Sequence, residues 1–151
     1  MKSFSVTTLE SQTRPALQNI IAALVKPLLP LAVRNNSFIV NDVPSFLNVD
    51  GDKNAVSEVI DGLLRSVINN ARESCIHITA QLLYGKMMMI SVKDDNSFNT
   101  YAVACSLQDI VPLAEKIGGE LNITSQRQRV TTIAFRFPIE EEPGVPATTR
   151  N

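Results

Sequence analysis

The sequence predicts one α/β domain, a two-layer sandwich whose helices cover one face of a mixed, mostly antiparallel sheet. Three observations lead to this fold class. The chain of 151 residues is long enough for one domain with a real core. A long segment with apolar residues at helical spacing follows a short strand, and the second half of the chain contains two β-hairpin patterns. The predicted order is helix, strand, helix, hairpin, helix, hairpin.

The composition is that of a globular protein without a strong charge bias. Apolar residues make up 44% and charged residues 19%, and the net charge is −1. This balance does not predict nucleic acid or an anionic membrane as a partner. The N-terminus is too polar for a secretory signal, and Lys26, Pro27 and Pro30 interrupt the longest apolar stretch. We therefore expect a cytoplasmic protein without a membrane span.

The residues that most often carry catalysis or bind metals are few. Cys75 and Cys105 stand far apart, with no further cysteine or histidine at ligand spacing, so we expect no metal site and two buried, reduced thiols. His77, the single histidine, falls on the polar side of a predicted strand. We expect a structural or surface role for His77 and no catalytic residue in the chain.

Three regions are predicted along the chain. Residues 1–12 are expected to form a flexible arm, residues 13–139 the domain, and residues 140–151 a disordered tail with too little apolar surface to fold. Within the domain, a helix should begin near Thr13, which can cap it, and should kink or end at Pro27 and Pro30. This helix either covers the core or pairs with a partner.

The middle of the chain predicts a strand, a long helix and a hairpin. Residues 37–41 read as a strand, and residues 46–49 as a second short extended piece. Asp52 is placed to cap a helix whose apolar positions follow the i, i+3, i+4 rhythm. These positions are Val56, Val59, Ile60, Leu63, Leu64, Val67, Ile68 and Ala71. Residues 75–83 and 86–93 then alternate as strands around a tight turn.

Two methionines stand out in that hairpin. Met87 and Met89 alternate with the core-facing residues of their strand, so they belong on the opposite face of the sheet, where His77 and Leu83 share their parity. Methionines often line adaptable binding surfaces. This face is therefore either a partner or dimer surface, or a surface packed under one of the terminal arms.

The last third predicts one helix and two strands. Residues 101–117 carry a helical apolar stripe that should bend at Pro112 and end at Gly118-Gly119. Residues 120–125 and 130–138 form the closing strands.

Four segments in this order resemble the ATP-binding domain of sensor histidine kinases, a Bergerat-fold domain of the superfamily shared with gyrase, chaperones and MutL proteins. The segments are Val49-Asp50-Gly51-Asp52 with the helix after it, Ile90-Ser91-Val92-Lys93-Asp94, Ala114-Glu115-Lys116-Ile117-Gly118-Gly119, and Val130 to Pro138. The resemblance covers about two thirds of the chain. It implies that Asp94 corresponds to the adenine-reading aspartate and that Thr131 lies beside it.

The same resemblance exposes departures from the family pattern. The asparagine that holds the magnesium of ATP corresponds to Ser66, and the helix's other usual asparagine corresponds to Gly62; a shifted register would supply Asn70 instead. Asp94 is followed by Asp-Asn-Ser-Phe, without the family's glycines. Between Asp94 and Leu107 there are twelve residues, with no glycine, lysine or arginine and no room for a lid.

These departures imply a degenerate nucleotide site. We expect no cofactor, although ATP with magnesium remains possible through Asp94, Thr131, Ser66 and Asn70. The expected function is a non-catalytic interaction or regulatory module in bacterial signalling, which binds a signalling kinase or response regulator or associates with itself. Two alternatives stay open: an active ATP-binding domain with an atypical site, and a small-molecule sensor that uses the vacated cleft.

Overall fold

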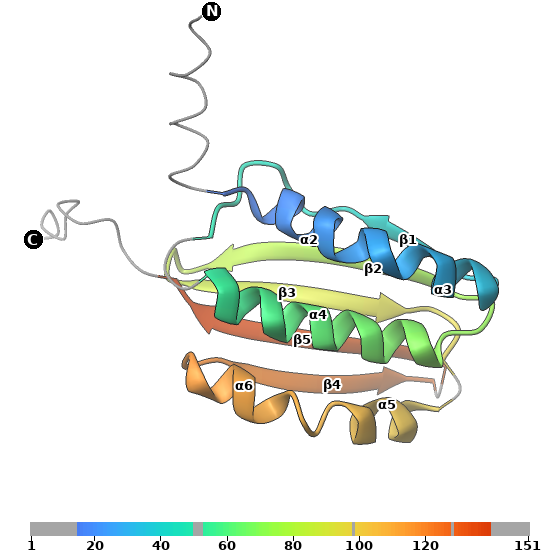
Figure 1. The fold of residues 1–151 in the computed structure, drawn as a ribbon. Coiled ribbons are helices and arrows are strands. Elements are labelled where there is room, and N and C mark those ends of the chain that lie inside the picture. Colours follow the sequence, from blue (N-terminus) through green and yellow to red (C-terminus); the bar gives the residue numbers. More distant parts are fainter. Residues whose placement is uncertain (1–14, 50–52, 98, 128, 140–151) are drawn as a thin grey trace, which may run out of the picture.

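The computed structural model describes residues 15–49, 53–97, 99–127 and 129–139. The helices are α2 (Leu17–Val25), the 3-10 helix η1 (Lys26–Leu28), α3 (Leu29–Arg34), α4 (Lys53–Asn70), α5 (Thr100–Ser106) and α6 (Val111–Lys116). The strands are β1 (Phe38–Asn41), β2 (Cys75–Leu83), β3 (Met87–Asp94), β4 (Glu120–Gln126) and β5 (Val130–Pro138). The helices lie together on one face of the sheet (Figure 1).

The sheet has five strands in the order β1-β2-β3-β5-β4. β1 pairs with β2 in parallel, and the other three pairs are antiparallel. The sheet is therefore mixed and mostly antiparallel, and the predicted two-layer fold class is confirmed. The chain leaves the end of β1 and returns through α4 to the edge of the sheet where β1 began. β2 therefore starts beside the start of β1, and the two strands run parallel.

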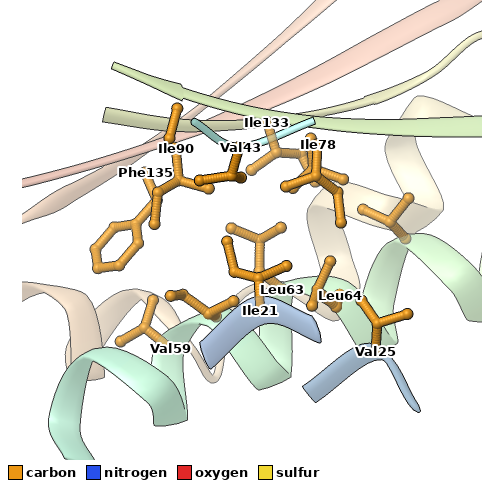
Figure 2. Close-up of a cluster of buried hydrophobic side chains, with 14 of the residues drawn as sticks. Ile21, Val25, Val43, Val59, Leu63, Leu64, Ile78, Ile90, Ile133 and Phe135 are labelled. Carbon is orange, nitrogen blue, oxygen red and sulfur yellow. The ribbon is translucent and has the colours of Figure 1, made fainter. Parts of the chain in front are cut away.

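The core lies between α4 and the sheet. Figure 2 shows Val59, Leu63 and Leu64 of α4 pointing toward side chains of three strands. The sheet side contributes Ile78, Ile90, Ile133 and Phe135, all fully buried, and α2 adds Ile21 and Val25 from the flank. The rings of Phe135 and Phe137 stack with their centroids 4.8 Å apart. The apolar stripe of α4 and the alternation along the strands thus build one continuous core.

The apolar segment Leu17–Arg34 is long and apolar enough to pass for a membrane-spanning helix, a test that core helices also pass. In this fold it consists of α2, η1 and α3, and Leu17, Ile21 and Leu28 are buried in the domain core. Pro27 and Pro30 stand at the starts of η1 and α3, where a missing N–H costs little.

Two tight turns follow the predicted chemistry. Tyr84 and Gly85 both have positive φ, 55° and 68°, as the two central residues of a type I′ turn do, and the amide of Lys86 donates to the carbonyl of Leu83 at 3.0 Å. At the end of α6, the amide of Gly119 donates to the carbonyl of Ala114 at 2.9 Å and the amide of Gly118 to that of Glu115 at 3.0 Å. These two bonds form a Schellman motif, with Gly118 at φ 77°.

Three predicted elements differ from the structure. The helix predicted to begin near Thr13 begins at Leu17 instead, because Ala16 is extended and forms a bridge with Asn48. That single bridge replaces the extended piece predicted for residues 46–49. The single bent helix predicted for residues 101–117 is two short helices, α5 and α6, because Pro112 cannot donate a backbone bond and stands in the first turn of α6.

Several predictions fall outside the described residues. They are the helix caps Thr13 and Asp52, the whole N-terminal arm at 1–12, and the tail at 140–151.

Gly119 offers a test of the packing between α6 and β5. An added Cβ there would lie 2.5 Å from the backbone oxygen of Arg136, which cannot move freely. We expect Gly119→Ala to lower the free energy of unfolding by about 3 kcal/mol in urea denaturation. The control is Gly85→Ala, whose Cβ meets nothing within 4 Å and whose left-handed backbone should cost only about 1 kcal/mol. Equal losses for the two variants would contradict this packing.

Candidate functional site

The four residues predicted for a nucleotide site lie at one end of the sandwich. Asp94 is the last residue of β3, and its register partner on β5 is Thr131. Asn70 is the last residue of α4, and Ser66 lies one helical turn before it. Figure 1 shows that α4 and β3 end on the same side of the domain, next to α5. The fold therefore brings together the residues that the sequence singled out.

Asp94 is buried, with 3% of its surface exposed. Its side-chain oxygen Oδ1 accepts a hydrogen bond of 2.9 Å from the backbone amide of Asn96. This Asx-type contact shapes the turn after β3. The following residue, Asp95, accepts a bond of 2.9 Å from the amide of Cys75 and so fixes the start of β2. At least one oxygen of the candidate adenine-reading carboxylate therefore already has a structural role.

Thr131 is also buried, at 2% exposure. Its hydroxyl donates to Oγ of Ser97 at 2.9 Å, and Oγ1 of Thr100 lies 2.7 Å away. Thr100 is the first residue of α5, so this chain of hydroxyl groups attaches the start of α5 to β5. The backbone amide of Ser97 adds a bond of 2.6 Å to the carbonyl of Arg129.

The far end of α5 is attached to α4. The hydroxyl groups of Ser66 and Ser106 are hydrogen-bonded to each other, and Ser66 is buried. The side-chain amide of Asn70 donates to the backbone carbonyl of Ser66 at 2.8 Å. The hydroxyl at position 66 and one amide proton of Asn70 are therefore used within the chain.

The turn between α5 and α6 also packs on α4. A Cβ at Gly62 would lie 2.6 Å from Cδ1 of Ile110, so the side chain of Ile110 occupies the space beside this glycine. Ile110 is itself buried. An asparagine at position 62 would have to displace it.

The sequence predicted Asp94, Thr131, Ser66 and Asn70 as site residues, but not the residues that contact them. It did not identify Ser97, Thr100, Ser106 or Ile110, because no spacing rule connects them to Asp94. The available signal was the run of hydroxyl-bearing residues around Asn99, whose side chain caps α5 by accepting a bond of 3.0 Å from the amide of Ala102.

The histidine and the two cysteines do not join this group of residues. His77 is on the uncovered sheet face, with Nε2 3.2 Å from Oδ2 of Asp42. The prediction of two buried thiols is wrong: Cys105 is exposed on α5, and Cys75 is only partly buried, because it lies on the uncovered face at the start of β2. Burial and the nearby carboxylates of Asp95 and Asp94 raise the pKa of the Cys75 thiol, so it is protonated at neutral pH.

Comparisons with known proteins match the fold rather than the sequence. No family model matches the chain, and no curated protein matches it. Among solved structures, the histidine kinase AdeS of Acinetobacter baumannii superposes with a TM-score of 0.68 at 9% identity, over 85% of this chain and 67% of that one. The nucleotide-free catalytic domain of the histidine kinase ThkA gives 0.63 at 16% identity, over 84% and 95%.

A third structure is the complex of ThkA with its response regulator protein TrrA. It gives a TM-score of 0.66 at 16% identity, over 85% of this chain but only 42% of that one. At these identities the likeness concerns the fold alone. The chain has the fold of the histidine kinase catalytic domain, the histidine-kinase-like ATPase fold.

Proposed function

We propose that this chain is a kinase-like signalling module that has lost its nucleotide site and works by binding protein. The single observation that carries the proposal is the position of α5. Bonds to Ser66 on α4 and to Thr131 on β5 hold this helix beside the end of the domain where the candidate nucleotide residues meet. An ATP molecule at that end would have to displace it.

The sequence of this region supports the same conclusion. The twelve residues between Asp94 and Leu107 contain no glycine and no cation. Phosphate groups are usually held by backbone amides of glycine-rich loops and by lysine or arginine. Here the described part of the segment forms a turn and a short helix, whose amides largely bond within the chain.

The partner class is inferred from the fold. ThkA, which shares the fold, crystallises in complex with a response regulator. We therefore infer that this chain binds a protein of the same signalling class, a kinase or a response regulator, in the bacterial cytoplasm. Its net charge of −1 gives no support for nucleic acid as a partner.

One observation favours the rival function, an ATP-binding domain with an atypical site. Asp94 and Thr131 keep the adjacent, buried placement that adenine recognition needs. The sensor alternative receives a different kind of support. A cavity of about 440 Å³ with mostly apolar walls, including Leu47, Ala80 and Met88, lies at the other end of the sheet. A small ligand would therefore bind there rather than in the vacated cleft.

Calorimetric titration with ATP and magnesium separates these functions. We expect no binding heat for ATP or a nonhydrolysable analogue at millimolar concentration, because α5 occupies the site. An active histidine kinase catalytic domain in the same buffer serves as the control. Micromolar binding that Asp94→Asn abolishes would establish the rival function and refute the proposal.

Thr131 distinguishes a structural from a ligand-holding network. Thr131→Val removes the hydroxyl that bonds to Ser97 and Thr100, and should lower the free energy of unfolding by about 1–3 kcal/mol. Thr132→Val is the matched control on the uncovered face and should change it by less than about 0.5 kcal/mol. Urea denaturation of both variants gives the comparison. If Thr131→Val were as stable as the wild type, the network would not be holding α5.

A further inference from the structure

The core side of the sheet is only partly covered at the end of the domain opposite Asp94. Along β2, Ile78 and Ala80 point toward the helices and are buried, whereas Leu82, two residues further on, is 41% exposed. Alternate residues of a strand share one face, so Leu82 also belongs to the core side. Its exposure shows that the described part of the chain leaves this end of the core open.

A cavity of about 440 Å³ lies at this opening. Three of the side chains that line it, Leu47, Ala80 and Met88, are buried, and they form an apolar floor. Leu82 and Phe46 line it from outside, and the ring of Phe46 is 76% exposed. A molecule in the cavity would remove both of these exposed side chains from water, which favours binding.

The methionines of β3 divide between the two faces of the sheet. Met87 and Met89, which the sequence suggested as a binding patch, lie on the uncovered face and are only partly exposed. Met88 stands between them, faces the other way and lines the cavity. Its unbranched side chain can adapt to the shape of a ligand.

The outer wall of the cavity is held in place by α2. The amide of Leu17 donates to the carbonyl of Leu47 at 2.9 Å. The side-chain amide of Gln18 donates to the carbonyl of Val43 at 2.8 Å. These two bonds fix the segment on both sides of Phe46. The cavity is therefore formed without a ligand, as small-molecule sites usually are.

The chemistry of the lining selects the class of ligand. None of the described residues that line the cavity is charged. A phosphate or carboxylate group would lose its water there without meeting a cation. The side-chain amides of Asn48 and Gln81 are the polar groups of the lining, and an amide can both donate and accept a hydrogen bond. This lining fits a neutral, mostly apolar molecule that carries a hydroxyl, amide or carbonyl group.

The size of the cavity separates a small molecule from a segment of a partner protein. Sites for small ligands usually measure about 300–1,000 Å³. A helix about 10 Å in diameter would fill the 440 Å³ with roughly one turn. The cavity therefore suits a compact organic molecule better than a helix of another protein.

We propose that this cavity binds a neutral, mostly apolar small molecule, with Phe46 and Leu82 packed against it and Asn48 or Gln81 bonded to its polar group. The site lies at the end of the sheet opposite Asp94 and Thr131. A ligand there would leave the contacts of α5 unchanged. The inference is therefore independent of the proposed loss of the nucleotide site.

Fluorescence titration of the full chain with N-phenylnaphthylamine tests the proposal. This neutral probe becomes bright in apolar surroundings, and the chain has no tryptophan that would interfere. We expect one probe to bind per chain with a dissociation constant on the order of 10 μM. Anilinonaphthalene sulfonate adds a negative charge to the same ring system and should bind at least about tenfold more weakly.

Two matched pairs of variants locate the site. Leu82→Glu places a charge in the lining and should weaken binding of the neutral probe at least about tenfold. Leu29→Glu, at a leucine of α3 with a similar exposure of 44%, should leave it unchanged. Phe46→Ala should weaken binding about three- to tenfold, whereas Phe38→Ala, at an exposed phenylalanine of β1, should not. Circular dichroism confirms that each variant is folded.

Several results would overturn the proposal. The first is a neutral probe that does not bind saturably up to its solubility limit. Equal affinity for the neutral and the anionic probe would contradict the class of ligand. Binding that Leu82→Glu and Leu29→Glu weaken equally, or that Phe46→Ala leaves unchanged, would place the probe outside this cavity.

Discussion

The attachment of α5 to its two neighbours is the constraint on which the functional account of this domain depends. α5 has only seven residues, too few for a stable isolated helix, so its position is set by contacts at both ends. Thr100 joins it to β5 and Ser106 joins it to α4. The hydroxyl groups of Thr131 and Ser66 therefore take part in contacts within the chain, which supports the proposal that the nucleotide site is lost.

The fold and the contacts that hold α5 have separate physical origins. The sandwich is built by the apolar stripe of α4 and the alternating apolar residues of β2, β3 and β5, whereas the candidate nucleotide residues are polar and lie at one end of these elements. Loss of ligand contacts therefore need not weaken the core. The same separation explains why solved kinase domains superpose on this chain at identities of 9–17%. Core periodicity is retained by many sequences, whereas a phosphate site depends on a few particular residues.

Most of the fold could be predicted from the sequence, because its signals are local or periodic. The hairpin at Tyr84-Gly85 needs residues that accept positive φ, and the end of α6 needs glycine, so both were found at their true positions. The division between α5 and α6 was missed because the apolar stripe continues across it, although Pro112 marked the place. The placement of Asp94 beside Thr131 was implied by the family resemblance, and the strand register pairs these two residues.

The contacts of α5 and of the turn after it with α4 could not be predicted, since they join residues far apart in the sequence through small polar or apolar groups. Ser66 meets Ser106, and Gly62 meets Ile110, without any pattern that a single sequence reveals. A crystal structure determined in the presence of millimolar ATP analogue and magnesium tests the central claim most directly. The account predicts α5 in place, with Ser66 still bonded to Ser106 and no ordered phosphates. Phosphates ordered beside Ser66, with α5 displaced from Thr131, would contradict it.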